Sequence, residues 1–122
     1  MRARLTSLKN PRVVRAVRLR DRRPRERQGL FLIEGYRELR RAIERGLPFE
    51  ELFICEELYL GENEPALVER AERECGAEVI PVTPQVFERI AYRDRPEGLL
   101  AVAPQPRWTL EGLPEGMGKI GV

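Results

Sequence analysis

The sequence predicts an α/β fold, a three-layer α/β/α sandwich with a mostly parallel four-stranded sheet and a basic helix at its N-terminus. Two observations predict it. Short apolar runs alternate with longer amphipathic segments from residue 30 to 103, and each connection is long enough to carry the chain back over the sheet. Hydrophobic residues make up 42% of the 122 residues, enough for the core of one domain.

The first predicted element is a basic helix. Asn10 is a suitable N-cap, and Pro11 fits the first helical position. Apolar residues recur among arginines up to about residue 20. The helix is expected to end near Arg23, because Pro24 restricts the residue before it. Residues 25–29 are then expected to form a polar loop.

Four apolar runs predict the strands, at residues 30–33, 52–55, 79–82 and 99–103. Amphipathic segments between them predict helices at residues 36–45, 63–75 and 84–91. Gly46 and Gly76 are expected to end the first two of these helices. Pro81 cannot donate a backbone hydrogen bond, which predicts an edge position for the third strand. The proline- and glycine-rich residues 104–122, with Trp108, are expected to form a linker.

Charge is distributed unevenly along the chain. The total net charge is +2, but residues 1–28 contain eleven Arg or Lys and two acidic residues, a net charge of +9, and the remainder carries −7. A basic segment beside an acidic body is typical of nucleic-acid binding. The alternative for residues 12–20 is a solvated helix face. The arginines between residues 20 and 27 are harder to explain without a polyanion, because like charges repel.

Several other functions are disfavoured. The chain has no His, which removes the commonest general base, and no glycine-rich phosphate loop follows a strand. Cys55 and Cys75 alone cannot form a structural zinc site, and both are expected to be buried apolar side chains. No metal site and no cofactor site are predicted in this chain. With neither a membrane span nor a secretory signal in view, the expected location is the cytoplasm and no membrane partner is expected.

Two loops carry the best candidate binding features. The first is at residues 34–37, after the first strand, and the second is at residues 92–98, before the last. Together they offer arginines, backbone amides at a helix start and the ring of Tyr92, which suit RNA loops. The loops can cooperate only if the first and last strands are close together. Alternatively, Glu34 caps the following helix and Tyr92 is a packing residue.

Three segments resemble the SpoU/TrmH family of RNA 2'-O-ribose methyltransferases. TSLKNPRV at residues 6–13 resembles the family's opening Ser-x-x-Asn-Pro segment. RQGLFLIEG at residues 27–35 is similar to its Phe-x-(Val/Ile)-Glu-Gly strand and turn. RPEGLLAV at residues 95–102 is similar to its Pro-x-Gly-(Ile/Leu)-x-Ala-Val strand, with Glu97 where Gln is common.

This resemblance implies the family's N-terminal substrate-binding domain, similar in fold to the kink-turn-binding ribosomal proteins. In those relatives RNA meets the same two loops. The implied organisation is a basic N-terminal arm at residues 1–28, an RNA-binding domain at 29–103 and the linker. The candidate RNA-binding residues are Arg4, Lys9, Asn10, Arg12, Arg15, Arg22, Arg23, Arg25, Arg27, Glu34, Gly35, Arg37, Tyr92, Arg93, Arg95 and Gly98.

The resemblance also implies a parent enzyme that methylates ribosomal or transfer RNA. Its knotted catalytic domain would bind S-adenosylmethionine and form a homodimer. That domain's motifs have no counterpart in this sequence, so the 122-residue chain alone is expected to be inactive. Two alternatives remain: a stand-alone RNA-binding or ribosome-associated module, and a protein-interaction module whose basic arm is only solvated.

Overall fold

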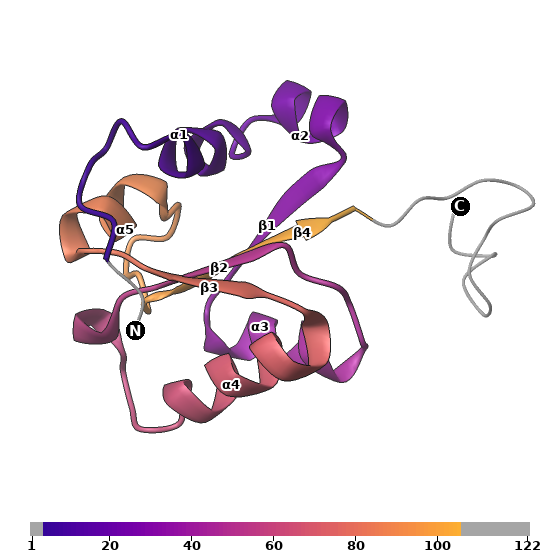
Figure 1. Ribbon diagram of the computed structural model, residues 1–122, viewed down its shortest axis with the longest axis vertical. Helices are drawn as coiled ribbons and strands as arrows, with labels where there is room; N and C mark the ends of the chain where they lie inside the picture. The colour runs from indigo at the N-terminus through magenta and orange to yellow at the C-terminus, as the bar shows by residue number, and fades with distance from the viewer. Residues whose placement is uncertain (1–3, 106–122) are drawn as a thin grey trace, which may run out of the picture.

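The computed structural model describes residues 4–105. Trp108 and residues 106–122 of the predicted linker lie outside them, and Pro104, predicted as the first linker residue, is the last residue of the final strand. Helices lie on both faces of one sheet, with α1 and α5 on one side and α3 and α4 on the other (Figure 1). The elements are α1 (Pro11–Arg18), α2 (Arg22–Gln28), β1 (Leu30–Glu34), α3 (Tyr36–Glu44), β2 (Glu51–Ile54), the 3-10 turn η1 (Glu56–Leu58), α4 (Glu64–Cys75), β3 (Glu78–Pro81), α5 (Pro84–Ile90) and β4 (Leu99–Pro104).

The sheet is mixed, so the prediction of a mostly parallel sheet is wrong. Its strand order is β1-β4-β2-β3. Only β2 and β3 pair in parallel, and β4 is antiparallel to both of its neighbours. The alternation of strands and helices therefore predicted the common direction of β1, β2 and β3, and failed for β4.

The short connection before β4 explains the reversal. Helix α5 has seven residues, about 10 Å of rise, whereas a six-residue strand spans about 20 Å. The chain that leaves α5 stays at the edge where β1 ends, because the backbone N–H of Tyr92 donates to the Glu34 carboxylate at 3.0 Å. Strand β4 begins at that edge and runs antiparallel to β1, with Glu34 opposite Leu100.

Strand β4 is buried on both faces. Leu99, Ala101 and Ala103 belong to the core beneath α3 and α4. Leu100 and Val102 belong to the core beneath α1 and α5. Side chains of a strand alternate between faces, so a central strand between two helical layers requires the continuous apolar run seen in the sequence.

The N-terminal segment forms two helices, which corrects the prediction of one long helix followed by a loop at residues 25–29. Helix α1 ends at Arg18, and α2 spans Arg22–Gln28. Pro24 lies in the first turn of α2, where backbone N–H groups have no helical partner, so it begins a helix and does not end one. Val13 and Ala16 of α1 are fully buried against the core.

The local signals in the sequence are confirmed. The side chain of Asn10 accepts from the Arg12 N–H at 2.9 Å and caps α1. Gly76 ends α4 with φ of 74°. Pro81 lies in the edge strand β3, as predicted. Cys55 and Cys75 are free and buried.

Candidate functional site

The two predicted loops meet at one edge of the sheet, because β1 and β4 are neighbours. Three hydrogen bonds join them. The Glu34 carboxylate accepts from Tyr92 N–H at 3.0 Å, and the Glu97 carboxylate accepts from Tyr36 N–H at 3.0 Å. The Gly35 N–H donates to the Leu99 carbonyl at 3.0 Å. We call the surface formed by residues 34–37 and 92–98 the two-loop site.

Glu34 anchors the two-loop site from beneath. Its side chain is fully buried, and among the described residues its Oε2 atom has no hydrogen-bond partner. Burial raises the pKa of the Glu34 carboxyl, and the Tyr92 N–H and the charge of Arg93 offset that effect only in part. The sequence alternatives for Glu34 included a helix cap, but its partner is the backbone of the second loop.

Arg93 spans the two loops. Its guanidinium lies 2.9 Å from a Glu38 oxygen on α3 and 3.1 Å from a Glu97 oxygen. It packs over Gly35, where φ is 103° and a Cβ atom would collide with the guanidinium. The backbone conformation favours glycine at this position, and a side chain here would also displace the guanidinium of Arg93.

The carboxylate of Glu97 lies at the N-terminal end of α3. The first amide of that helix, at Tyr36, already donates to the Glu97 carboxylate. The sequence predicted that the amides at this helix start could hold a phosphate, and a side chain of the protein itself takes the first of them. A hollow of about 400 Å³ remains beside it, lined by Tyr36, Arg37, Glu38, Leu60, Arg93 and Glu97.

Arg37 and Arg95 are the exposed cations of the two-loop site. Neither has an ion pair among the described residues. Gly98, by contrast, is buried with φ of 79°, and a Cβ there would collide with the Cys55 carbonyl. Its contribution is to the path of the chain into β4 and not to a contact surface.

Three arginines of the N-terminal segment bind carboxylates of the body. Arg4 lies 2.9 Å from Glu57, and it lowers the pKa of that exposed carboxyl to about 2. Further along, α1 pairs with the start of β2 and β3. These bonds are Arg12 to Glu78 at 2.7 Å, Arg15 to Glu51 at 2.9 Å and Arg15 to Glu50 at 3.2 Å. The uneven charge along the sequence is thus partly neutralised within the fold.

The remaining predicted residues of this segment have other roles. Arg22 pairs with Glu26 on α2 at 2.9 Å. Arg25 donates to the carbonyls of Leu19 and Arg20 at the end of α1. Lys9, Arg23 and Arg27 are exposed and make no ion pair with any described residue.

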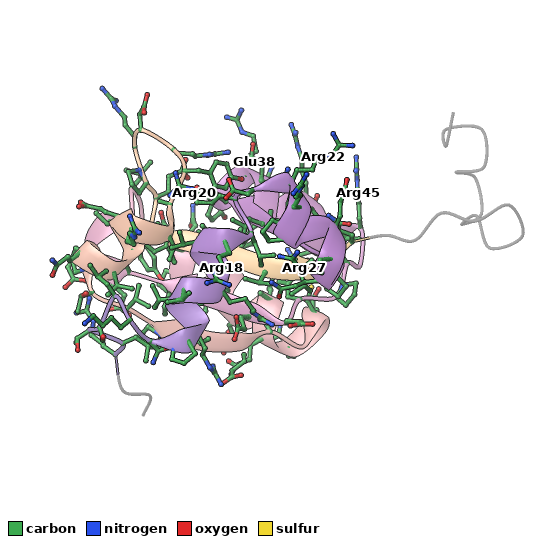
Figure 2. All side chains as sticks on the ribbon, turned by 90° about the horizontal axis from the view of Figure 1, so that it is seen from above. Arg18, Arg20, Arg22, Arg27, Glu38 and Arg45 are labelled. Atoms are coloured by element: carbon green, nitrogen blue, oxygen red, sulfur yellow. The ribbon has the colours of Figure 1, made fainter. Side chains whose placement is uncertain are left out.

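Five exposed arginines without a carboxylate partner in the described chain were not among the predicted site residues: Arg18, Arg20, Arg41, Arg45 and Arg89. Arg18 and Arg20 belong to the predicted basic segment, and the other three were missed. Arg22 and Arg45 extend outward from the surface in Figure 2, which also shows Arg18, Arg20 and Arg27. A signal for two of the missed arginines was available in their spacing. Arg37, Arg41 and Arg45 are spaced four residues apart, which places them on one face of α3.

Two structural features bear on other kinds of function. Within residues 4–105, no three His, Cys, Asp or Glu side chains gather as metal ligands would. None of the helices in that range is both long and apolar enough to cross a membrane.

Comparison with known proteins identifies the class. Residues 10–101 match the model of the MRM3-like substrate binding domain, and the chain belongs to this family. Its fold matches a solved RNA 2'-O ribose methyltransferase with 35% identity and a TM-score of 0.74 over 92% of this chain. It also matches the SpoU methyltransferase AviRb from Streptomyces viridochromogenes, solved with AdoMet, with 26% identity and a TM-score of 0.65 over 86% of this chain.

An rRNA methyltransferase from Sinorhizobium meliloti shares the fold, with 22% identity and a TM-score of 0.72 over 91% of this chain. The chain spans only 41%, 37% and 40% of the three solved chains, respectively. It is thus similar to the substrate-binding part of SpoU/TrmH enzymes. Among curated protein sequences, none matches this chain.

Proposed function

We propose that this chain is the RNA substrate-recognition domain of an S-adenosylmethionine-dependent RNA 2'-O-ribose methyltransferase. The observation that carries the proposal is the junction of the two loops by Glu34 and Tyr92, beside the unpaired cations Arg37 and Arg95. Family membership supports it, because solved relatives are RNA methyltransferases. An anionic ligand of irregular shape suits such a surface better than a small neutral one.

The proposal divides the work between two parts of a parent enzyme. This chain would hold ribosomal or transfer RNA. A separate catalytic domain would bind S-adenosylmethionine, transfer the methyl group to a ribose 2'-hydroxyl and form the homodimer.

RNA binding across a salt series tests the proposal. The probes are transcribed ribosomal RNA hairpins and bulk transfer RNA, and the protein is the full 122-residue chain. The variant Arg37→Gln/Arg95→Gln removes the two exposed cations of the two-loop site. The control Arg70→Gln/Arg73→Gln removes the same charge from α4, where both arginines already pair with Glu74.

The expected result is salt-dependent binding of one of these RNAs. In the two-loop variant, the slope of log affinity against log salt should fall by about 0.7 for each phosphate that the protein no longer binds. The control should bind as the unchanged protein does. An absence of RNA binding at low salt, or equal reductions in both variants, would overturn the proposal and favour a protein-interaction module.

Deleting residues 1–28 would test RNA binding less clearly than these substitutions do. Val13, Ala16 and Leu19 are fully buried in the core that α5 completes. Removing α1 would expose that core, and loss of binding would then report unfolding. Substitution of exposed arginines leaves the core intact.

A further inference from the structure

A groove follows the open edge of the sheet outside β1. It consists of two adjoining hollows of about 470 and 280 Å³ that share Phe31, Leu32 and Tyr92 in their linings. One hollow extends toward the end of α1 and the start of α2, and the other toward α3. Through Tyr92 this edge groove is continuous with the two-loop site.

The backbone of β1 is available to a ligand in this groove. Strand β1 is at the end of the strand order and pairs only with β4. The Gly35 N–H donates to the Leu99 carbonyl, and the Gln105 N–H donates to the Gly29 carbonyl. In an antiparallel pair every second residue bonds to the neighbouring strand, so these two bonds show which residues of β1 bond to β4. Phe31 and Ile33 therefore bond to β4, and the N–H and C=O of Leu32 face the groove.

The groove is rich in cations that carry no carboxylate partner. In the part of the chain that the structure describes, none of its four arginines forms an ion pair, whereas Arg12 and Arg15 of α1 both do. The four are Arg20, Arg25, Arg41 and Arg45. Arg20 and Arg25 donate to backbone carbonyls, so their charges are not neutralised.

The acidic side chains in the groove offset this charge only in part. Glu38 is held by Arg93 at 2.9 Å, and Glu34 is buried beneath the surface. Asp21 is the exposed acidic residue, at the N-cap of α2. A net excess of unpaired cations around an apolar floor favours an anionic ligand that also has flat apolar surfaces.

Three arginines form a row along α3. Arg37 lines the hollow of the two-loop site, and Arg41 and Arg45 line the groove. Successive members are separated by about 6 Å of helix rise. Like charges at this spacing disfavour the helix unless an anion lies between them. The row leads from the two-loop site into the edge groove.

Tyr92 supplies the aromatic surface. Tyr92 lines both hollows and is 49% exposed, although its backbone N–H is held by the Glu34 carboxylate. A base can stack on such a ring only when its face is free. Paired bases in a duplex cover their faces by stacking on one another, whereas unpaired bases do not.

We propose that the edge groove binds an unpaired segment of RNA. One base stacks on the ring of Tyr92, and the phosphates follow the row of Arg37, Arg41 and Arg45. This inference rests on the proposed function and adds a substrate class: an RNA with unpaired nucleotides next to the part that the two-loop site holds. A second copy of the chain that pairs with β1 is the competing occupant, and the unpaired cations argue against it.

Fluorescence anisotropy tests the inference with the full chain at low salt. The probes are a fluorescein-labelled RNA of mixed sequence, about twelve nucleotides long, and the same strand annealed to its complement. The single strand should bind about tenfold more tightly than the duplex. Tyr92→Leu should weaken single-strand binding by about tenfold, and Tyr92→Phe, which keeps the ring, by less than about twofold.

A charge variant and its control complete the experiment. Arg41→Gln/Arg45→Gln should flatten the salt dependence of single-strand binding, and Arg70→Gln/Arg73→Gln on α4 should not. Circular dichroism checks that each variant is folded. Since Tyr92→Phe and Tyr92→Leu both retain an apolar side chain, a difference between them reports the ring and not packing alone.

Three results would overturn the inference. Duplex could bind as tightly as single strand, or Tyr92→Leu could bind as well as Tyr92→Phe. Alternatively, light scattering could show that the unchanged chain is a dimer and that single-stranded RNA does not dissociate it. The proposed function survives the first two results if structured RNA still binds through Arg37 and Arg95, and it fails separately if no RNA binds at all.

Discussion

The carboxylate of Glu34 accepts a hydrogen bond from the backbone N–H of Tyr92 at 3.0 Å, across 58 positions of sequence. This hydrogen bond connects the end of β1 to the loop before β4. It holds the aromatic ring beside the row of arginines on α3, and it places a buried carboxyl beneath the proposed RNA surface.

Glu34 should make stability depend on pH. Burial raises the pKa of its carboxyl in the folded protein above the ordinary 4.5. The folded state therefore holds this proton more tightly, and the group's contribution to stability falls as pH rises from below 4.5 through the raised pKa. Glu34→Gln should lack that component, which urea unfolding from about pH 4 to 8 can measure.

The comparison uses the difference between Glu34→Gln and the unchanged protein at each pH. Other carboxyls act in the opposite sense, because arginine partners lower the pKa of Glu57 and Glu74. Their contribution cancels in the difference. A stability difference that does not change with pH would contradict the raised pKa of the Glu34 carboxyl.

Gly98 should tolerate no side chain. Gly98→Ala combines a φ of 79° with a collision against the Cys55 carbonyl, and we expect a loss of about 3 kcal/mol in the free energy of unfolding. Gly46→Ala is the matched control, because Gly46 has φ of 74° and open space around it. The control should lose about 1 kcal/mol. Equal losses in urea unfolding would contradict the close approach.

Glu97→Gln should increase RNA affinity. The amide oxygen of Gln can still accept from Tyr36 N–H, but the ion pair with Arg93 is lost. One negative charge leaves the two-loop site and the guanidinium of Arg93 becomes freer to bind phosphate. Stability should fall by less than about 1 kcal/mol, because the pair is partly exposed.

Affinity for the RNA probes, measured beside Glu69→Gln, checks this prediction. Glu69 lies on α4 and its loss changes the net charge equally. An increase in both variants would indicate a general charge effect. A decrease in Glu97→Gln alone would show that the carboxylate itself contacts the ligand.

Arg15→Gln should destabilise the fold. Its partner Glu51 has a side chain only 10% exposed, and the other guanidinium beside that carboxylate, that of Arg12, is farther away at 3.8 Å. Loss of the hydrogen-bonded partner of an almost buried carboxylate costs about 1–3 kcal/mol. Arg18→Gln on the same helix removes an exposed charge that forms no ion pair within residues 4–105, so the cost should be below about 0.5 kcal/mol. Equal losses of stability in the two variants, measured by thermal or urea unfolding, would contradict the stabilising role of the ion pair between Arg15 and Glu51.

Much of the fold could be predicted because its signals are local. The apolar runs indicated all four strands, and Asn10, Gly76 and Pro81 marked a cap, a helix end and an edge strand. The direction of β4 could not be predicted, because it depends on the edge of the sheet at which the chain lies after the short helix α5. That position is set by the hydrogen bond between Glu34 and Tyr92, two residues distant in sequence.

The candidate site could also be predicted only in part, because some of it depends on contacts between distant segments. The motifs around Glu34 and Glu97 located both loops, whose meeting depends on the pairing of β1 with β4. The ion pairs of Arg12 and Arg15 could not be predicted, because they depend on how α1 lies over the acidic starts of β2 and β3. Charge along the sequence does not show which arginines the fold neutralises.

The salt dependence of RNA affinity, compared between two variants of equal charge change, tests most directly whether the exposed unpaired arginines bind RNA. Arg37→Gln/Arg95→Gln removes the two exposed arginines of the two-loop site, and Arg70→Gln/Arg73→Gln removes ion-paired arginines of α4. The first variant should reduce the slope of log affinity against log salt by about 1.4, because two phosphates of the RNA are no longer bound, and the second should leave it unchanged. Equal reductions in both variants, or none in either, would contradict RNA binding by the exposed arginines.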